Sequence, residues 1–466
     1  MNSLTTFVST YPSNQTKVTV LLSMFDLSSC IFLMDQRRYA HFRVSIMSGL
    51  SENMYSVFCD VQKAPPIEVT TLSEQCQEDS AENKVNLTLG VYRPFNGKPS
   101  KIPVVRKVEI EMAQDPSLNK DYLPITGLPA FCSAGIRLLL GSEHPAISSN
   151  LVDAVQCIGG SGAVYLAAQF LKKILKFSTV LIPKPSWPSH CGICLLSGYN
   201  ILYYRYWNQK TQCLDFTELL EDISSAPDNS VVILHACAHN PTGMDLAPEQ
   251  WMELAQLMKK KRLFPLFDIA YQGLASGDID QDAWAIRMFL EHGFEFFAAQ
   301  SFSKNFGLYN DRVGNLVFGT MNKDLTANTK SQLLILARYC WSNPPNHGAT
   351  IVSKVLNDPQ LYAEWKSNLR EMSDRIVRTR QLFYEKLTAM GTPGNWENII
   401  KQRGMFSYTG LSREQTNILR EKFHVYMTGD GRMNMCGLNE SNIDYVVKAF
   451  HETVLCGAAG DVTQTA

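Results

Sequence analysis

The sequence predicts an α/β protein: a large domain with a mainly parallel sheet between layers of helices, plus a smaller α+β domain. Two observations predict this fold. Short apolar runs alternate with helical stretches through the middle of the chain, and after Pro359 the pattern changes to a long helix followed by short strand-like pieces. Strands separated by helices pair in parallel, which gives the sheet. The 466 residues leave room for two to three domains at about 150 residues each.

The strands and helices follow in order along the chain. The apolar run 154–158 predicts a strand, glycines and Ser161 break it, and apolar residues recur at helical spacing from Ala163 to Lys176. Ligands bind such sheets at the carboxyl ends of the strands, so we expect His235, Asp268 and Ser301 at that edge. A helix is expected at 250–261, and further strands at 179–182, 231–235, 263–268, 295–301 and 312–318.

The first 55 residues are interpreted as an extension outside the folded body. The stretch Val18–Met34 is mostly apolar, but it contains Asp26 and falls short of the about 20 residues needed to span a bilayer. It lacks the basic start of a secretory signal and the many arginines of a transit peptide. A poorly ordered extension is favoured, and a targeting or anchoring role is the alternative.

The charge balance and the cysteines indicate which partners, compartment and metal sites to expect. Lys and Arg number 43 and Asp and Glu 44, a net charge of −1, so nucleic acid is not an expected partner. The 12 cysteines are scattered, which is typical of a reducing compartment such as the cytoplasm. Cys191 and Cys194 have the spacing of half a zinc site, but no second pair completes it, so no metal is expected and buried thiols are favoured over redox chemistry.

A glycine-rich turn suggests an anion site. The segment Gly160-Ser161-Gly162 opens a predicted helix, where backbone N–H groups and the positive helix end favour phosphate. Glycine is also needed there for steric reasons alone, so the turn by itself is a weak signal. Ser301, Ser303 and Arg312 strengthen it, because they place hydroxyls and a bidentate donor after a neighbouring strand.

Two ionisable residues end apolar strands. Lys304 follows the run 295–301, so its amine is expected in a partly desolvated pocket where a neutral nucleophile could form a Schiff base; an ordinary surface lysine is the alternative. Asp268 ends the run 263–268 and needs a partner if it is buried. A pyridinium nitrogen, a helix N-terminus and an arginine all remain open as that partner.

Six segments along the chain together carry a family pattern, and they lie at 85–93, 122–128, 235–243, 301–307, 341–345 and 431–434. Together these segments resemble the aspartate aminotransferases, which use pyridoxal 5′-phosphate on the fold-type-I scaffold. The resemblance extends from about Ser56 to Val454, and the sequence around Lys304 is closer to that of the cytosolic branch.

The resemblance also implies a domain organisation. It implies an N-terminal arm and the first part of the small domain at 56–100, a large cofactor-binding domain at 101–371, the rest of the small domain at 372–456, and a tail at 457–466.

The resemblance implies three catalytic residues. Lys304 would bind the cofactor covalently and then move a proton between the substrate α-carbon and the C4′ atom of the cofactor. Asp268 would keep the pyridine nitrogen protonated, so that the ring can take up electrons. Tyr271 would donate to the phenolic oxygen of the cofactor.

It also implies the remaining cofactor contacts. Asn240 would share the phenolic oxygen, Trp187 would stack on the ring, and His190 would support Asp268. Tyr122 would reach the phosphate from the neighbouring subunit. The other cofactor-binding residues are Gly160, Ser161, Gly162, Ser301, Ser303 and Arg312.

Two arginines imply the substrate class. Arg432 matches the family residue that pairs with the α-carboxylate, and Arg338 matches the one that crosses the dimer interface to the distal carboxylate. Together they imply acidic amino acids and 2-oxo acids as substrates, and a homodimer with shared active sites. Neither nucleic acid nor a membrane is an expected partner, given the balanced charge and the short apolar stretch 18–34. The same pocket would be lined by Gly90, Trp187, Asn240, Ser342, Asn343 and Phe406.

The expected activity is transfer of the amino group of L-aspartate to 2-oxoglutarate, giving oxaloacetate and L-glutamate by a ping-pong mechanism in the cytoplasm. The chain departs from the family pattern at Thr88 and Leu89, at Pro188-Ser189 and at Ile269, none of which removes a functional group. These departures leave the rate and the preference among acidic amino acids open. The alternatives are a racemase or decarboxylase of acidic amino acids and a catalytically weak paralogue.

Overall fold

The computed structural model describes residues 56–93 and 101–461, with side chains to 456. The chain divides into one unit at 1–65 and a second at 66–466. Of the first unit, only 56–65 is described, and it holds a single turn at 57–60. The extension predicted at 1–55 lies outside the described residues, as do 94–100 and 462–466.

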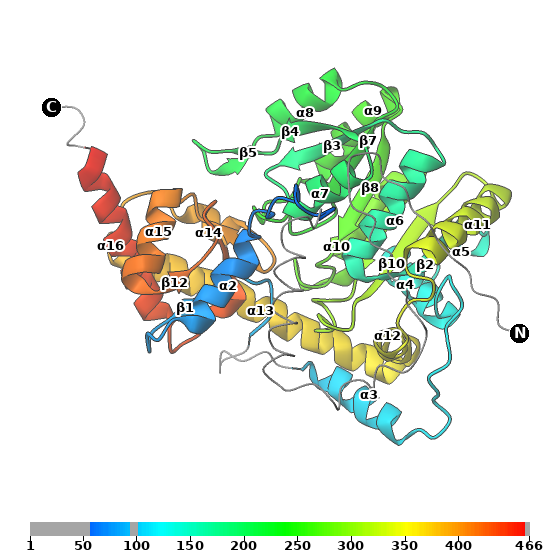
Figure 1. Cartoon of the computed structure of the whole chain (residues 1–466), viewed down its shortest axis with the longest axis horizontal. Helices are drawn as coiled ribbons and strands as arrows, with labels where there is room; N and C mark the ends of the chain where they lie inside the picture. The colour runs from blue at the N-terminus through cyan, green and yellow to red at the C-terminus, as the bar shows by residue number, and fades with distance from the viewer. Residues whose placement is uncertain (1–55, 94–100, 462–466) are drawn as a thin grey trace, which may run out of the picture. The chain divides into compact units, whose positions relative to one another are not determined.

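The second unit is built around a seven-stranded sheet with the order β2-β10-β9-β8-β7-β3-β4 (Figure 1). β10 is antiparallel to both of its neighbours, and the other adjacent strands are parallel. The mainly parallel sheet predicted from the sequence is therefore confirmed. Its strands are β2 (Val152–Ile158), β3 (Thr179–Lys184), β4 (Asn200–Arg205), β7 (Val231–His235), β8 (Phe264–Ile269), β9 (Phe296–Ser301) and β10 (Val313–Gly319).

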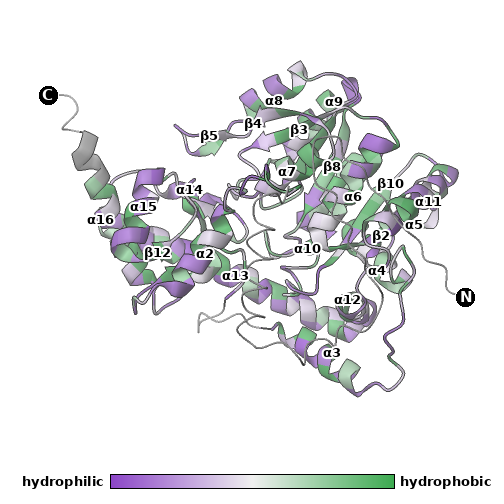
Figure 2. Ribbon diagram, viewed as in Figure 1, coloured by the Kyte–Doolittle hydropathy of each residue, from purple (hydrophilic) through white to green (hydrophobic). Residues whose placement is uncertain are grey.

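Alternating side chains place the sheet between two apolar layers. In β7, Val231 and Ile233 pack into one hydrophobic cluster, whereas Val232 and Leu234 pack into the other, as the two-residue period of a strand requires. Figure 2 shows apolar colour concentrated in the strands and on the helix sides that cover them. One face is covered by α6 (Gly159–Lys173) and α11 (Lys323–Cys340), and the other by α4 (Pro129–Leu140), α9 (Pro248–Lys260) and α10 (Ile279–Glu291).

Outside the large sheet, the described part of the second unit contains further helices and three two-stranded pairings. β1 (Val85–Asn86) is parallel to β12 (Val425–Tyr426), and β11 (Phe406–Tyr408) is antiparallel to β13 (Arg432–Asn434). A short hairpin, β5 (Trp207–Asn208) with β6 (Cys213–Leu214), precedes α8. The remaining helices are α2 (Glu68–Glu78), α3 (Pro103–Gln114), α5 (Pro145–Ser148), α7 (Pro188–Leu196), α8 (Phe216–Ser225), α12 (His347–Asn357), α13 (Pro359–Ala389), α14 (Glu397–Lys401), α15 (Arg413–Phe423) and α16 (Ile443–Asp461), with a 3₁₀ turn at Met435–Gly437.

The domain boundaries stay a prediction. The boundary expected at 371/372 falls inside α13, a single 31-residue helix. The tail expected at 457–466 begins inside α16, whose backbone is helical as far as Asp461.

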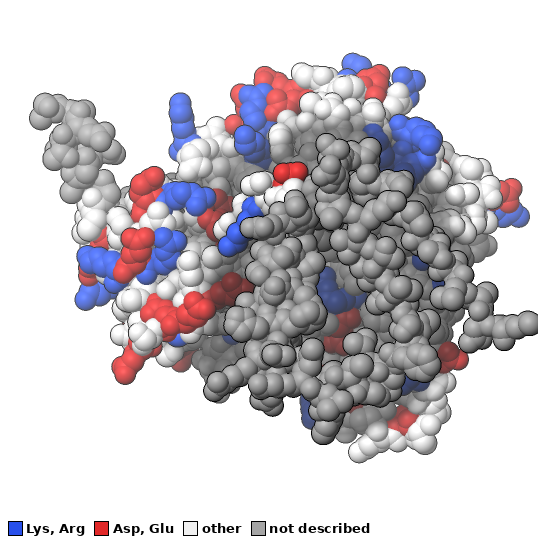
Figure 3. All heavy atoms as spheres, in the orientation of Figure 1, with Lys and Arg blue, Asp and Glu red and all other residues white. Residues whose placement is uncertain are grey.

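The surface charges match the balanced composition of the chain, and the length and polarity of the helices bear on membrane insertion. Figure 3 shows basic and acidic side chains interspersed on the face in view. In the part of the chain that the structure describes, no helix is both long and apolar enough to cross a bilayer.

Candidate active site

Three neighbouring strands bring the predicted site residues to one edge of the sheet. His235 ends β7, Asp268 lies one residue before the end of β8, and the two are paired in register. Ser301 ends β9, and Lys304 follows it in a tight turn. Because β7, β8 and β9 are parallel, their carboxyl ends meet at the same edge, as the sequence predicted.

Asp268 is held by a chain of hydrogen-bonded side chains. Its Oδ2 lies 3.1 Å from Nε2 of His190, which comes from α7 and is fully buried. Nδ1 of His190 lies 3.0 Å from the Ser186 hydroxyl, which in turn lies 3.4 Å from Nε2 of His235. Burial acts to raise the pKa of Asp268, but the His190 hydrogen bond and the charges of His190 and Lys304 outweigh it, so the pKa falls below its ordinary value. The carboxylate is therefore ionised and suited to hold a cationic ring nitrogen.

Lys304 and Tyr271 lie together, close enough to Asp268 for its charge to act on both. The Lys304 amine is 5.2 Å from the centre of the Tyr271 ring. Burial lowers the pKa of Lys304, Asp268 acts in the opposite sense, and Arg312 and Arg432 add to the lowering. Burial raises the pKa of Tyr271, so its hydroxyl stays a hydrogen-bond donor. A lysine with a lowered pKa is an available nucleophile and proton carrier.

The start of α6 forms an anion cradle with Arg312. A Cβ atom on Gly159 would lie 2.9 Å from Cζ of Arg312, and one on Gly160 would lie 2.9 Å from Cβ of Ser301. Gly159 has φ +66°, and no side chain caps the helix. Nη1 of Arg312 donates to the carbonyl of Tyr309 at 3.0 Å and reaches the Ser303 hydroxyl at 3.5 Å. Free helix N–H groups, two hydroxyls and a guanidinium suit a phosphate group.

A second guanidinium lies at the other end of the site. Arg432 is 4.3 Å from the centre of the Phe406 ring; its Nη1 lies 3.5 Å from Oδ1 of Asn240, and its Nη2 donates to the Thr88 carbonyl at 3.1 Å. Phe406 also closes against Gly90, where a Cβ atom would lie 2.6 Å from its ring. The contact to Thr88 is through its backbone, so this departure from the family pattern leaves the hydrogen bond in place.

Trp187 lies beside His190, the hydrogen-bond partner of Asp268. Its ring centre is 5.1 Å from that of His190, at an angle of 89°. Ile269, another departure from the family pattern, is fully buried in the core. Among the described residues, no group of three or more His, Cys, Asp or Glu side chains is placed to hold a metal ion.

Four predicted site residues lie apart from this constellation. Tyr122 is 85% exposed, and Arg338 is exposed with its Nη1 at 2.5 Å from the Ser342 hydroxyl. Ser342 donates to Asn343, whose Nδ2 donates to the carbonyl of Leu123. Ser342 and Asn343 thus tie the Arg338 segment to the Tyr122 segment.

Sequence reasoning missed three contributors. It assigned no role to Gly159, to Ser186 or to the His235 side chain, although His235 was expected at the sheet edge. Gly159 could have been found from the glycine pair at the strand end. Ser186 and His235 are 49 residues apart, and nothing in the sequence indicates that they touch.

Comparison with known proteins decides the family. Residues 82–450 match the model of aminotransferase class I and II. The chain belongs to the class I and II aminotransferases. It is 47% identical to cytoplasmic aspartate aminotransferase of Gallus gallus over 405 residues, which cover 86% of this chain and 98% of the relative.

Solved structures of aminotransferases superpose on the chain. Aspartate aminotransferase from Saccharomyces cerevisiae cytoplasm has a TM-score of 0.84 and 38% identity, covering 85% of this chain and 98% of that one. Aromatic-amino-acid aminotransferase from Burkholderia pseudomallei, covalently bound to pyridoxal phosphate, has a TM-score of 0.83 and 38% identity, covering 86% and 100%. The protein is therefore a pyridoxal-phosphate-dependent aminotransferase of fold type I, and the cradle, Asp268 and Lys304 fit that cofactor.

Proposed function

We propose that this aminotransferase moves the amino group of L-aspartate to 2-oxoglutarate and releases oxaloacetate and L-glutamate. The observation that carries the proposal is the placement of Arg432, a partly buried guanidinium next to Asn240 and Phe406, whose charge also acts on Lys304. Burial lowers the pKa of Arg432, yet a guanidinium stays charged at neutral pH. An α-carboxylate is the natural partner for it.

The second carboxylate of the substrate would be bound by Arg338. Within one chain, Arg338 donates a hydrogen bond to the Ser342 hydroxyl and is exposed, so its guanidinium would be accessible to a substrate in the site of a neighbouring subunit. Tyr122 is exposed in the same way and is tied to the same segment through Leu123 and Asn343. We therefore propose a homodimer in which each subunit supplies Arg338 and Tyr122 to the other's site.

Each inner residue has a defined task in this proposal. When bound, pyridoxal phosphate supplies an electron sink for the carbanion formed at the substrate α-carbon. Lys304 would remove the proton from the substrate α-carbon and deliver it to the C4′ atom of the cofactor, which its lowered pKa supports. Asp268, held by His190, would pair with the ring nitrogen, and Tyr271 would donate a hydrogen bond from its protonated hydroxyl.

The phosphate would be bound by the cradle at the start of α6. Gly160, Ser161 and Gly162 would donate backbone N–H groups, while Ser301, Ser303 and Arg312 would complete the cup. Trp187 would lie against the ring, and Asn240 would contact its phenolic oxygen. We place the enzyme in the cytoplasm, in line with its cytoplasmic relatives.

A steady-state assay with product analysis tests the proposal. Cofactor-loaded protein is incubated with L-aspartate and 2-oxoglutarate, and the products are separated by chiral chromatography. We expect L-glutamate and oxaloacetate in equal amounts, with kcat/KM for L-aspartate well above that for L-phenylalanine. D-aspartate would indicate racemisation, CO₂ with alanine or β-alanine would indicate decarboxylation, and no product from a folded, loaded enzyme would refute the proposal.

A further inference from the structure

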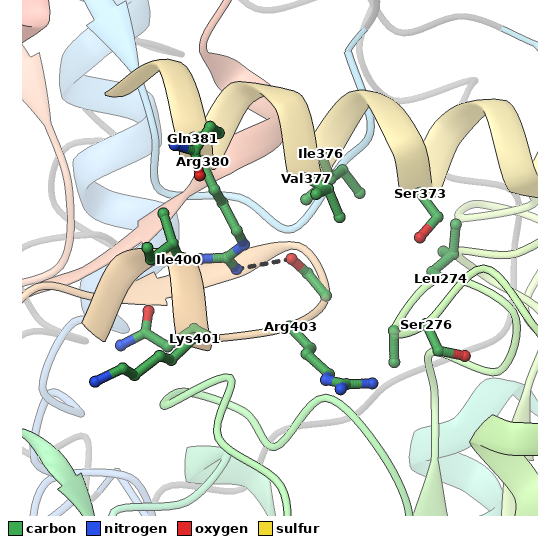
Figure 4. Close-up of a pocket in the computed structure, with 13 residues that line it drawn as sticks. Leu274, Ser276, Ser373, Ile376, Val377, Arg380, Gln381, Ile400, Lys401 and Arg403 are labelled. Atoms are coloured by element: carbon green, nitrogen blue, oxygen red, sulfur yellow. Dashed lines mark hydrogen bonds between the residues drawn. The ribbon is translucent and has the colours of Figure 1, made fainter. Parts of the chain in front are cut away.

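A cavity of about 450 Å³ lies between α13, the end of α14 and two loops, apart from the cofactor site. Figure 4 shows Arg380 extending from α13 toward the end of α14, where Lys401 lies, and the loop that carries Arg403, with Leu274 and Ser276 across the opening. None of the residues assigned to cofactor or substrate lines it. Its 13 lining residues include three cations and no carboxylate.

Arg380 is the most deeply placed of these cations. Its side chain is 2% exposed, and its two terminal nitrogens donate to the backbone carbonyls of Ile399, Gly404 and Phe406. The Nε atom is buried and has no hydrogen-bond partner. In the described part of the chain, no carboxylate lies within ion-pair distance of Arg380. A buried charge bound only to neutral carbonyls is incompletely compensated, and an anion in the cavity would complete it.

Two further cations lie on the rim. Arg403 is exposed, and its side chain makes no hydrogen bond or ion pair with the described residues. Lys401 pairs with Glu397 at 3.1 Å, but both side chains are 54% exposed, so the pair is weak and easily exchanged. Ser373, which is 2% exposed, adds a hydroxyl to the wall.

Two carboxylates near the cavity, those of Asp282 and Asp245, do not line it and accept hydrogen bonds from other groups. Asp282 accepts hydrogen bonds from the Ser276 hydroxyl and from the N–H groups of Gly273, Ala275 and Ser276. Asp245, which interacts electrostatically with Arg403, accepts from the N–H groups of Ala238 and His239. The cavity itself is therefore cationic.

We propose that this cavity binds a compact anion with two or more negative charges, a phosphate or a polycarboxylate, between Arg380, Arg403 and Lys401. The three cations supply charge-assisted hydrogen bonds from two sides, and the volume suits a molecule of that size. The site is independent of the proposed reaction, because its residues take no part in it.

The test uses the cofactor-loaded Arg432→Ala protein, so that the substrate pocket lacks its α-carboxylate ligand and the cofactor fills the phosphate cradle. Inorganic phosphate and citrate are titrated separately by calorimetry at low ionic strength, because salt screens such contacts. Arg403→Ala and Arg403→Lys are added to this background, and Arg262→Ala, at an exposed arginine outside the cavity, is the matched control.

The expected result is saturable binding of one anion per chain. Arg403→Ala should weaken it about tenfold, Arg403→Lys less, and Arg262→Ala not at all. Tighter binding of phosphate supports a phosphate-type ligand, and tighter binding of citrate supports a polycarboxylate. No saturable binding, or equal affinity with and without Arg403, would overturn the proposal; because no turnover is measured, failure of the proposed reaction would not affect this result.

Discussion

At the scale of single residues, the Asp268 carboxylate is the first point at which the account can be tested. Asp268→Asn keeps the shape of the side chain but removes the charge that, in the proposed mechanism, would pair with the ring nitrogen. We expect kcat to fall by about 10²–10³, the size of effect seen when one preorganised electrostatic contact is lost. Steady-state kinetics check this, with the exposed carboxylate variant Asp280→Asn as control. An Asp268→Asn enzyme with near-normal kcat would remove Asp268 from the mechanism.

The pH response of Lys304 is a second test at this scale. Burial lowers its pKa, whereas Asp268 raises it. In the cofactor-free protein, the rate at which Lys304 reacts with an amine reagent should therefore rise with a midpoint below about 10.4, the value of a free lysine side chain. Asp268→Asn should move that midpoint lower still, because the carboxylate no longer favours the charged form. Peptide mass spectrometry across pH measures both midpoints, and a shift to higher pH in Asp268→Asn would contradict the electrostatic argument.

At the scale of elements, α13 supports the turn that carries Lys304. Trp365 of α13 is fully buried, stacks on Phe306 at 4.7 Å, and donates from Nε1 to the carbonyl of Asn305 at 2.9 Å. Trp365→Ala should lower the free energy of unfolding by about 3–5 kcal/mol. It should also reduce cofactor occupancy, since Phe306 and Asn305 directly follow Lys304.

Urea unfolding and the ratio of bound cofactor to protein measure the two effects. Trp365→Phe should retain most of the packing and lose about 1 kcal/mol with the hydrogen bond. The partly exposed Trp284 provides the control variant Trp284→Ala. If the destabilised Trp365→Ala protein still bound one cofactor per chain, α13 would contribute to stability but not to positioning the Lys304 turn.

The buried strands of the sheet could be predicted from the sequence, whereas the edge strand β4 and one contact between distant residues could not. Continuous apolar runs such as 231–235 predicted buried strands, because a strand covered on both faces has few polar positions. β4 was not predicted, since it is an edge strand with a mixed burial pattern. Residues near Lys304 in sequence were found by motif, whereas the contact of Ser186 with His235 depends on how α7 packs against the sheet and leaves no local pattern.

At the scale of the whole molecule, the shared site is the main proposal. Lys304→Ala and Arg338→Ala should each be nearly inactive, because one would lack the proposed proton carrier and the other the arginine proposed for the distal carboxylate. If the sites are shared, a mixed dimer of the two has one intact site. Random mixing after reversible dissociation should then restore about a quarter of the wild-type activity.

A second mixture, of Lys304→Ala with Asp268→Asn, is the control for this experiment. Lys304→Ala mixed with Asp268→Asn should restore almost nothing if the two residues act in the same site from the same chain, since the intact site would again require both. The structure places them in one chain's pocket, where Lys304 lowers the pKa of Asp268. Activity of the Lys304/Arg338 mixture no greater than that of its components would contradict a site shared between subunits.

A single-turnover measurement shows whether Lys304 enables amino-group transfer from L-aspartate. Cofactor-loaded enzyme is mixed with L-aspartate in the absence of any 2-oxo acid, and oxaloacetate is quantified after rapid quenching, with Lys304→Ala alongside. We expect about one equivalent of oxaloacetate per subunit from the wild type and none from the variant. Loaded wild-type enzyme that releases no oxaloacetate, or a variant that releases as much as the wild type, would show that Lys304 does not have this role.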